Sequence, residues 1–185
     1  SDIFCTAPDF TALSAFRSLV TLHFASGGRV VIPDAEARSD PLALALVCER
    51  YGVTRLTAVP GVLRALCKAG ARVGPAELRA LRTFLSGSGV LDFATADMVR
   101  ERFGIPVVDY YGGREFATAA YSDPDSAHTM SAGGGELHGC LALIVDDDHD
   151  LAAPGATGEI VVHSDSMTLS DLPSIATSGK WAGWH

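Results

Sequence analysis

The chain has 185 residues, of which 48% are hydrophobic and 19% are charged, so its composition is that of a folded globular protein and excludes a disordered segment. Its formal net charge of -8 argues against a nucleic-acid or anionic-membrane partner, because both attract basic surfaces. No run is long and apolar enough to span a bilayer, and the length suits one domain or slightly more.

The spacing of the cysteines and the first residues of the chain indicate the cellular compartment. The four cysteines are widely separated and form no Cys-x-x-Cys pair, which favours buried, reduced thiols over disulfides or zinc ligands; they are Cys5, Cys48, Cys67 and Cys140. The first three residues lack the basic segment of a signal peptide. We therefore expect a cytoplasmic protein.

Strands and helices alternate through the first two thirds of the chain. Short apolar runs that stop at proline or glycine predict strands over residues 2–6, 29–32, 53–59, 83–85 and 105–110. Apolar residues at helical spacing predict helices over residues 12–24, 42–51 and 60–69, with a further short one over 75–81. Another helix begins at Asp92, ends at Gly104, and turns Phe93, Met98, Val99 and Phe103 inward.

This alternation predicts an α/β fold with a mostly parallel sheet and helices on both faces. After Glu115 the alternation stops; a further strand is predicted over 117–121, and strands over 141–145 and 159–163 with a turn between them predict a partial antiparallel β subdomain. The glycine run 133–135 marks the expected boundary between an α/β subdomain at 1–134 and the β subdomain at 135–185.

The most informative stretch is residues 107–115, where an apolar run passes into two tyrosines, two glycines and a charged pair. We predict that the strand ends at Tyr110 and that a loop follows it, at the sheet edge where ligands collect in open α/β folds. Tyr111 offers a flat face for a purine ring; alternatively, it covers the sheet edge. Glu115 offers a carboxylate to a hard cation such as Mg²⁺; alternatively, it pairs with Arg114.

A second glycine-rich loop, Ser86-Gly87-Ser88-Gly89, follows the preceding predicted strand. Parallel strands bring this loop beside residues 111–115, so we expect the two loops to be neighbours. The loop presents backbone amides without bulk, but it lacks the lysine of a phosphate-binding loop and the spacing of a nucleophile elbow. By itself this loop is a weak signal, and a plain turn is the favoured interpretation. The acidic run 146–150 lacks calcium-ligand spacing and indicates a solvated hairpin turn.

Four stretches in this order resemble the central part of adenylate-forming enzymes, the superfamily of acyl-CoA synthetases, nonribosomal peptide synthetase adenylation domains and luciferases. Residues 57–63 are similar to the strand, proline and helix that line the family's acyl pocket, and residues 85–91 to its Ser-Gly-Gly-Ala-Pro-Leu loop. Residues 111–115, Tyr-Gly-Gly-Arg-Glu, resemble its Tyr-Gly-x-Thr-Glu motif. Residues 154–159, Pro-Gly-Ala-Thr-Gly-Glu, resemble its Pro-Gly-x-x-Gly-Glu hairpin.

The resemblance implies an ATP-dependent acid–thiol ligase that activates a small carboxylic acid as an acyl-adenylate. Coenzyme A, or phosphopantetheine on a carrier protein, then accepts the acyl group. Carried over by position, the nucleotide-binding residues would be Ser88, Gly89, Val90, Asp109, Tyr110, Tyr111 and Gly112. Glu115 would hold Mg²⁺ against the ATP phosphates, and Arg114 would lie beside it with a catalytic role.

Departures from the family's pattern leave an alternative open. Arg114 replaces the motif's threonine, Val90 replaces the loop's proline, and Phe10-Thr11 stands where many acyl-CoA synthetases have an aromatic–histidine pair. The family's phosphate loop, its Thr-Gly-Asp motif and its catalytic-lysine domain do not occur in these 185 residues, so we expect this piece alone to be inactive. The alternatives are a non-catalytic adenylation-like scaffold or docking domain of a larger synthetase, and an unrelated nucleotide-binding α/β domain.

Overall fold

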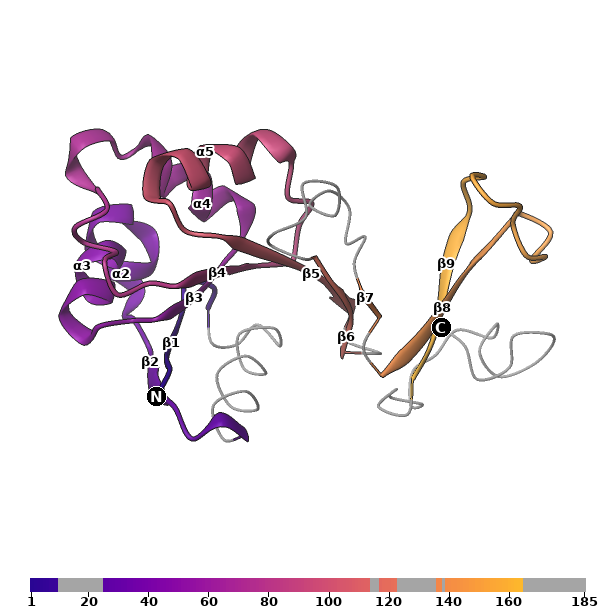
Figure 1. Ribbon diagram of the computed structural model, residues 1–185, viewed down its shortest axis with the longest axis horizontal. Helices are drawn as coiled ribbons and strands as arrows, with labels where there is room; N and C mark the ends of the chain where they lie inside the picture. Colours follow the sequence, from indigo (N-terminus) through magenta and orange to yellow (C-terminus); the bar gives the residue numbers. More distant parts are fainter. Residues whose placement is uncertain (10–24, 114–116, 123–135, 138, 165–185) are drawn as a thin grey trace.

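The main sheet is mostly parallel, as predicted. The computed structural model describes residues 1–9, 25–113, 117–122, 136–137 and 139–164. Its seven-stranded sheet has the order β2-β1-β3-β4-β5-β6-β7 (Figure 1). The strands are β1 Ile3–Thr6, β2 Arg29–Val31, β3 Arg55–Ala58, β4 Thr83–Ser86, β5 Val107–Gly113, β6 Ala117–Tyr121 and β7 Glu136–Leu137. The pairs from β2 through β5 are parallel, and β6 and β7 add antiparallel strands at the end.

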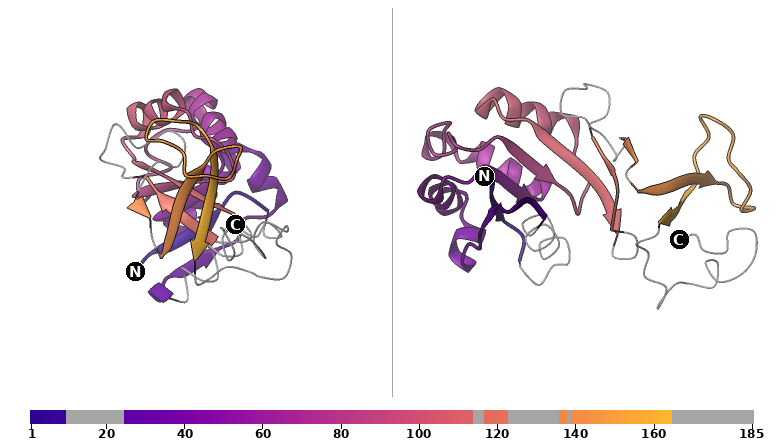
Figure 2. Two further views of the ribbon diagram at one scale, coloured as in Figure 1. Left: turned by 90° about the vertical axis from the view of Figure 1, so that its right-hand side faces the viewer. Right: turned by 60° about the horizontal axis from the view of Figure 1, so that its bottom comes forward.

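A second, two-stranded antiparallel sheet pairs β8 (Cys140–Val145) with β9 (Glu159–Ser164). The right-hand view of Figure 2 shows β5 leading away from the helices toward this second sheet. The predicted strands at 141–145 and 159–163 are therefore confirmed. The division of the chain at residues 134 and 135 stays a prediction; β7, just beyond it, still pairs with β6.

The described helices gather together on one side of the large sheet (Figures 1 and 2). They are α2 Ala35–Ser39, α3 Pro41–Tyr51, α4 Pro60–Lys68 and α5 Phe93–Phe103, with one 3-10 turn at Gly70–Arg72. The helix predicted over residues 12–24, which would cover the other face, lies outside the described residues. No helix within the described ranges has the length and apolarity needed to cross a membrane.

Local capping chemistry sets where these helices begin and end. Asp40 accepts a hydrogen bond from the Leu42 N–H at 3.0 Å and starts α3 immediately before Pro41. Gly52 ends α3 with a φ of 63°, a left-handed conformation that glycine adopts without strain. Asp92 caps α5 through the Thr95 N–H at 2.7 Å. Each of these signals is readable in the sequence, which is why the two helices were predicted correctly.

Two predicted features are wrong. Residues 75–80 form turns instead of a helix: the hydrogen bonds there run from Arg79 to Ala76 and from Leu81 to Leu78, three residues back, and the i to i−4 bonds of an α-helix do not form. Phe93 is exposed at the first position of α5, whereas the other three predicted inward residues, Met98, Val99 and Phe103, do face the core, together with Thr95 and Ala96. Helix α2, which the prediction missed, begins at Asp34, whose carboxylate accepts from the Ala37 N–H at 2.8 Å.

The core lies between the sheet and these helices. Leu56, Phe84 and Val107 are successive neighbours on β3, β4 and β5, and all three are fully buried. The Phe84 ring packs on Phe103 of α5 with ring centroids 6.3 Å apart. Burying each such side chain contributes about 1.5–3 kcal/mol, so this row fixes the relative positions of the strands that carry the site described below.

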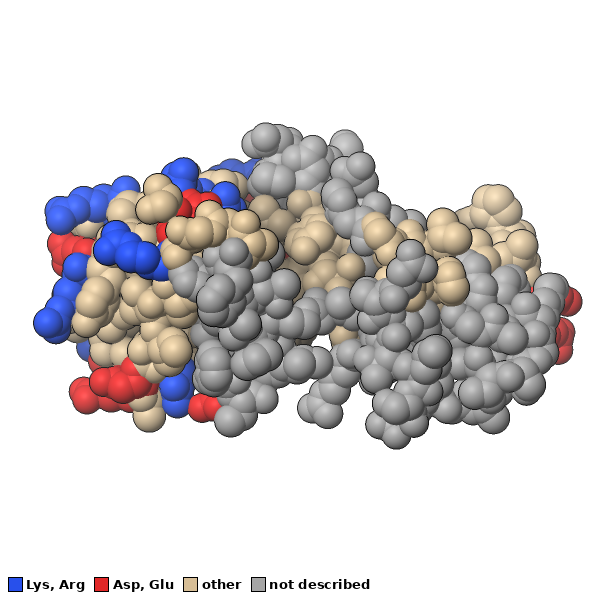
Figure 3. Space-filling view, turned by 90° about the horizontal axis from the view of Figure 1, so that it is seen from below, with Lys and Arg blue, Asp and Glu red and all other residues tan. Residues whose placement is uncertain are grey.

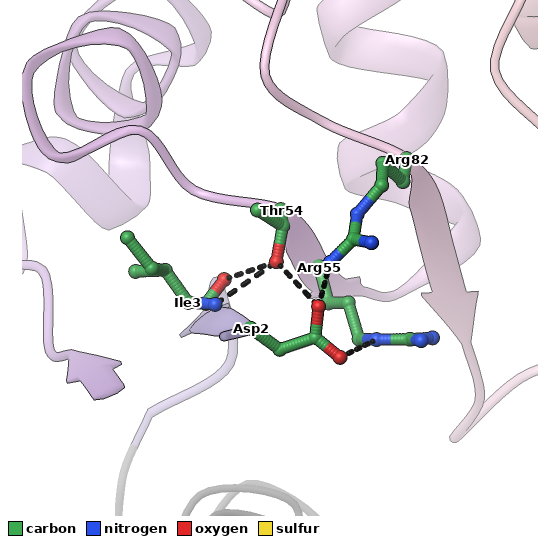
Figure 4. Close-up of polar contacts among 5 residues, drawn as sticks. All are labelled: Asp2, Ile3, Thr54, Arg55 and Arg82. Carbon is green, nitrogen blue, oxygen red and sulfur yellow. Dashed lines mark hydrogen bonds and ion pairs between the residues drawn. The ribbon is translucent and has the colours of Figure 1, made fainter. Parts of the chain in front are cut away.

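Polar contacts secure the amino-terminal edge of the same strands (Figure 4). The Asp2 carboxylate accepts hydrogen bonds from Arg55 Nε at 2.9 Å and from the Arg82 guanidinium. The Thr54 hydroxyl lies 3.2 Å from Asp2 Oδ1 and accepts the Ile3 N–H at 2.9 Å. One carboxylate therefore ties together the starts of β1, β3 and β4.

Replacing Asp2 by asparagine should lower the free energy of unfolding by about 1 kcal/mol, since both arginines lose a charged partner but remain partly solvated. Urea unfolding followed by circular dichroism measures this. Asp9→Asn is the matched control, because the Asp9 side chain that pairs with Arg38 is 54% exposed whereas that of Asp2 is 21% exposed, so its loss should matter less. Equal effects for the two substitutions would contradict the bridging role of Asp2.

Charge is distributed unevenly between the two sheets. Arginines and lysines lie at the helix-bearing end, mixed with acidic residues (Figure 3). The sequence has no lysine or arginine from Glu115 to Gly179, and this segment carries β6 to β9. The acidic run 146–150 closes on itself as predicted, with Asp146 Oδ1 accepting from the Asp148 and Asp150 N–H groups at 3.1 and 2.9 Å.

Candidate functional site

The candidate site lies at the carboxyl edge of the parallel strands. Ligands in open α/β sheets bind outside the carboxyl ends of the strands. At that edge Ala58, Ser86 and Asp109 are successive register partners on β3, β4 and β5. The loop after β4 therefore starts beside the end of the parallel part of β5, as predicted.

The loop after β4 is an open backbone segment held at both ends. Ser86 and Leu91 are fully buried, whereas Ser88, Gly89 and Val90 are exposed, Val90 to 75%. Ser88 has a φ of 61°, unusual for a residue with a side chain. A methyl group on Gly89 would only touch Pro60 of α4 at 3.6 Å, so this loop lies against the start of α4. Residues 88–90 are therefore accessible to a ligand.

Asp109 lies buried in β5 beneath this loop, with 4% of its surface exposed. Its N–H donates to Ser122 Oγ at 2.7 Å, and its carbonyl accepts the Ser122 N–H at 2.7 Å. Carboxylate oxygen Oδ1 has no hydrogen-bond partner among the described residues. Burial raises the pKa of this carboxyl to about 6, and the neighbouring Ser86 hydroxyl opposes the rise without completing a hydrogen bond.

Two buried hydroxyls at the same edge were not predicted. Ser86 Oγ and Thr6 Oγ1 are both buried and lack hydrogen-bond partners within the described part of the chain. Buried polar atoms are nearly always bonded, so unpartnered ones indicate a place where a ligand group or water completes the set. The sequence signal for them is weak, because serine and threonine are also common at the ends of ordinary strands.

β5 continues further than predicted. Instead of releasing Tyr111, Gly112 and Gly113 into a loop, the strand runs to Gly113 and pairs with β6 as a hairpin. The antiparallel partner supplies hydrogen bonds that a lone strand end would lack, and the register shifts between Tyr111 and Gly112. Tyr111 keeps 38% of its surface exposed, and Gly112 is exposed beside it opposite Thr118.

Tyr110 lies on the other face of β5 from Asp109 and Tyr111, as neighbouring residues of a strand do. Its ring stands beside that of Tyr121 on β6, with centroids 6.5 Å apart and an angle of 47°. Of the predicted site residues, the structure thus brings Ser88, Gly89 and Val90 to the same edge as Asp109, Tyr110, Tyr111 and Gly112.

The predicted metal-binding and catalytic residues, Glu115 and Arg114, lie outside the described residues. Within the described residues no group of three or more histidine, cysteine, aspartate or glutamate side chains could hold a metal ion. In the sequence, Arg114 and Glu115 directly follow Gly113, the last residue of β5.

Comparisons with known proteins match nearly the whole chain. A family model described as "AMP-binding enzyme" matches residues 1–170. The chain is 32% identical, over 191 aligned positions, to an indoleacetate–CoA ligase of Aromatoleum aromaticum, covering 98% of this chain and 35% of that protein. It is 26% identical over 164 positions to tyrocidine synthase 3 of Brevibacillus parabrevis, covering 79% of this chain and 2% of that protein.

The solved structures agree on the fold. An anthranilate CoA ligase in complex with anthranoyl-AMP superposes on 100% of this chain and 36% of its own, with a TM-score of 0.86 and 18% identity. At that identity the likeness concerns the arrangement of strands and helices alone. The chain spans about a third of the length of the two CoA ligases.

Proposed function

The chain belongs to the family of AMP-binding enzymes, and from this premise we propose that it forms the nucleotide-binding centre of an acid–thiol ligase. Such a ligase joins a carboxylic acid to AMP, releases pyrophosphate, and passes the acyl group to a thiol. The observation that carries the proposal is the carboxyl edge itself, where the open loop after β4 lies beside Asp109 and the exposed Tyr111 of β5. Relatives named as ligases favour this function over a non-catalytic scaffold.

Each residue has a proposed role that its surroundings support. The backbone of Ser88, Gly89 and Val90 contacts the adenine, because that segment is exposed. Asp109 Oδ1, which has no hydrogen-bond partner among the described residues, accepts a hydrogen bond from the adenine amino group, and this bond offsets the cost of burying the atom. Tyr111 stacks on the base with its exposed ring. Gly112 lets the backbone approach the nucleotide closely, since it has no side chain.

We propose that Glu115 holds Mg²⁺ together with phosphate oxygens of ATP. Protein magnesium sites commonly use one or two carboxylates and complete their shell with phosphates and water. This suits a chain whose described residues contain no cluster of metal ligands. The ion's chemistry is to offset charge on the phosphates as the α-phosphorus is attacked. Arg114, adjacent in sequence, is proposed to bind phosphate through its planar guanidinium.

The acid substrate, the thiol acceptor and the cellular location are also proposals. We propose a small carboxylic acid as the group activated, supported by relatives named for indoleacetate and sulfoacetate. Coenzyme A is the acceptor that these names support, and the match to tyrocidine synthase 3 supports a carrier-protein thiol as the other. The four cysteines, all within the described residues, are reduced thiols, which supports a cytoplasmic location. The separate second sheet supports a division of the chain near residues 134 and 135.

Hydrogen–deuterium exchange with and without AMP tests where the nucleotide binds. Millimolar AMP should slow exchange in residues 86–90 and 109–113 and leave residues 1–5 at the opposite edge unchanged. Cytidine monophosphate, which presents a smaller base and the same phosphate, is the control and should give weaker protection. Protection confined to the amino-terminal edge, or no protection at all, would rule out the site.

A further inference from the structure

Gly87 lies directly under the ring of Tyr110. A β-carbon placed on Gly87 would come within 2.7 Å of the ring atom Cε1 and still closer to Cζ. Real β-carbons do not approach heavy atoms so closely, so no side chain fits at position 87 while Tyr110 keeps its place. The contact joins the loop after β4 to the part of β5 that carries the predicted site.

The Tyr110 ring is bounded on its other side as well. β5 and β6 pair Tyr110 with Tyr121, and the two rings lie 6.5 Å apart at an angle of 47°. This pair lies on the face of the sheet opposite the helices, because Val107 and Asp109 alternate with Val108 and Tyr110, and Val107 belongs to the helix-covered core. The ring therefore occupies a slot between the backbone of Gly87 and the ring of Tyr121.

We propose that Gly87 is a positioning residue of the site: its missing side chain seats the Tyr110 ring, and the seated ring fixes how β5 presents Tyr111. This inference rests on the proposed function, because Gly87 is assigned a role in positioning Tyr111, the residue proposed to stack on the base. Gly87 acts without touching the nucleotide. Its contribution is to set the distance between the loop after β4 and the end of β5.

The expected response to a methyl group at position 87 follows from the stiffness of the ring. A tyrosine side chain can rotate only about χ1 and χ2 and its ring is rigid, so a methyl group at position 87 displaces the whole Tyr110 ring. Tyr110 and Tyr111 are adjacent on one strand, and moving the first changes the backbone that orients the second. The loss should therefore appear as weaker binding of the base and a changed environment of the tyrosine pair.

A double-mutant cycle tests this inference with AMP as the ligand. In the wild-type background, Gly87→Ala should lower AMP affinity about tenfold, within the range for losing one base–aromatic stack. In the Tyr110→Ala background, where no ring occupies the slot, the same Gly87→Ala change should have no further effect. An equal loss in both backgrounds, or no loss in the wild-type background, would overturn the proposal.

Urea unfolding of the same four proteins separates this inference from the proposed function. Gly87→Ala should lower the urea midpoint and change the near-ultraviolet circular dichroism only when Tyr110 is present. Equal shifts in both backgrounds would overturn the seating role whether or not AMP binds. If the wild-type chain binds no AMP but this dependence on Tyr110 is observed, the proposed function fails and the seating role stands. Gly74→Ala is the matched control, because a β-carbon there meets only a Glu77 oxygen at 3.5 Å.

Discussion

Replacing Asp109 by asparagine is expected to stabilise the fold by up to about 3 kcal/mol at pH 8. Burial raises the pKa of the Asp109 carboxyl from its ordinary value of 3.8 to about 6. One pKa unit corresponds to about 1.4 kcal/mol, so ionising this group in the folded state costs about 3 kcal/mol more than in the unfolded chain. Asparagine has a similar shape and stays neutral, so it removes that cost.

The sign of the pH dependence follows from the direction of the shift. A carboxyl with a raised pKa binds its proton more tightly in the folded state, so its stabilising contribution is fully present below pH 3.8. That contribution is lost as the pH rises through about 6. The stability difference between Asp109→Asn and wild type should therefore be small at pH 4 and reach its full size above pH 7.

Urea unfolding at a series of pH values between 4 and 8 measures this difference. Asp92→Asn is a control of opposite sign, because hydrogen bonds from the Thr95 N–H and hydroxyl lower the pKa of Asp92. Its loss should destabilise the fold throughout this pH range, because the contribution of a carboxyl with a lowered pKa is lost only as the pH falls below 3.8. A difference between Asp109→Asn and wild type that does not vary with pH would show that Asp109 is not held in its buried, proton-binding state.

Elements governed by local chemistry could be predicted from the sequence. Helices α3 and α5 each combine a capping aspartate with a terminal glycine in the left-handed conformation, and both signals act within a few residues. Strands β8 and β9 could be predicted because apolar runs flank a self-capped acidic turn. The need for glycine at position 158 is evident only from the structure, since a side chain there would clash with the carbonyl of Val145 on the paired strand.

Elements that depend on distant partners could not be predicted in detail. The extension of β5 to Gly113 exists because β6 pairs with it, and no feature of residues 111–113 alone indicates that partner. The edge position of the site followed from the alternation of strands and helices, which places consecutive strand ends together. The burial of Asp109, the two unpartnered hydroxyls and the contact of Gly87 with Tyr110 require knowledge of which side chains meet in space.

Replacing Tyr111 by alanine is expected to weaken AMP binding about 30-fold. Stacking of one base on an aromatic side chain is worth about 1–3 kcal/mol, and the middle of that range corresponds to this factor. Tyr111 suits the role because it is 38% exposed and lies two residues after Asp109, beside which the loop after β4 begins. Phenylalanine at the same position keeps the flat ring, so Tyr111→Phe should retain most of the affinity.

The central claim is that the carboxyl edge of the parallel sheet, with Tyr111 on it, binds the nucleotide. Calorimetric titration of AMP into the wild-type chain, Tyr111→Ala and Tyr51→Ala tests it most directly. Tyr51 is the matched control, because it is also an exposed tyrosine, at 49%, but ends α3 just before β3 begins, at the opposite edge. We predict a loss of affinity for Tyr111→Ala and none for Tyr51→Ala, whereas equal affinity in all three proteins would contradict the claim.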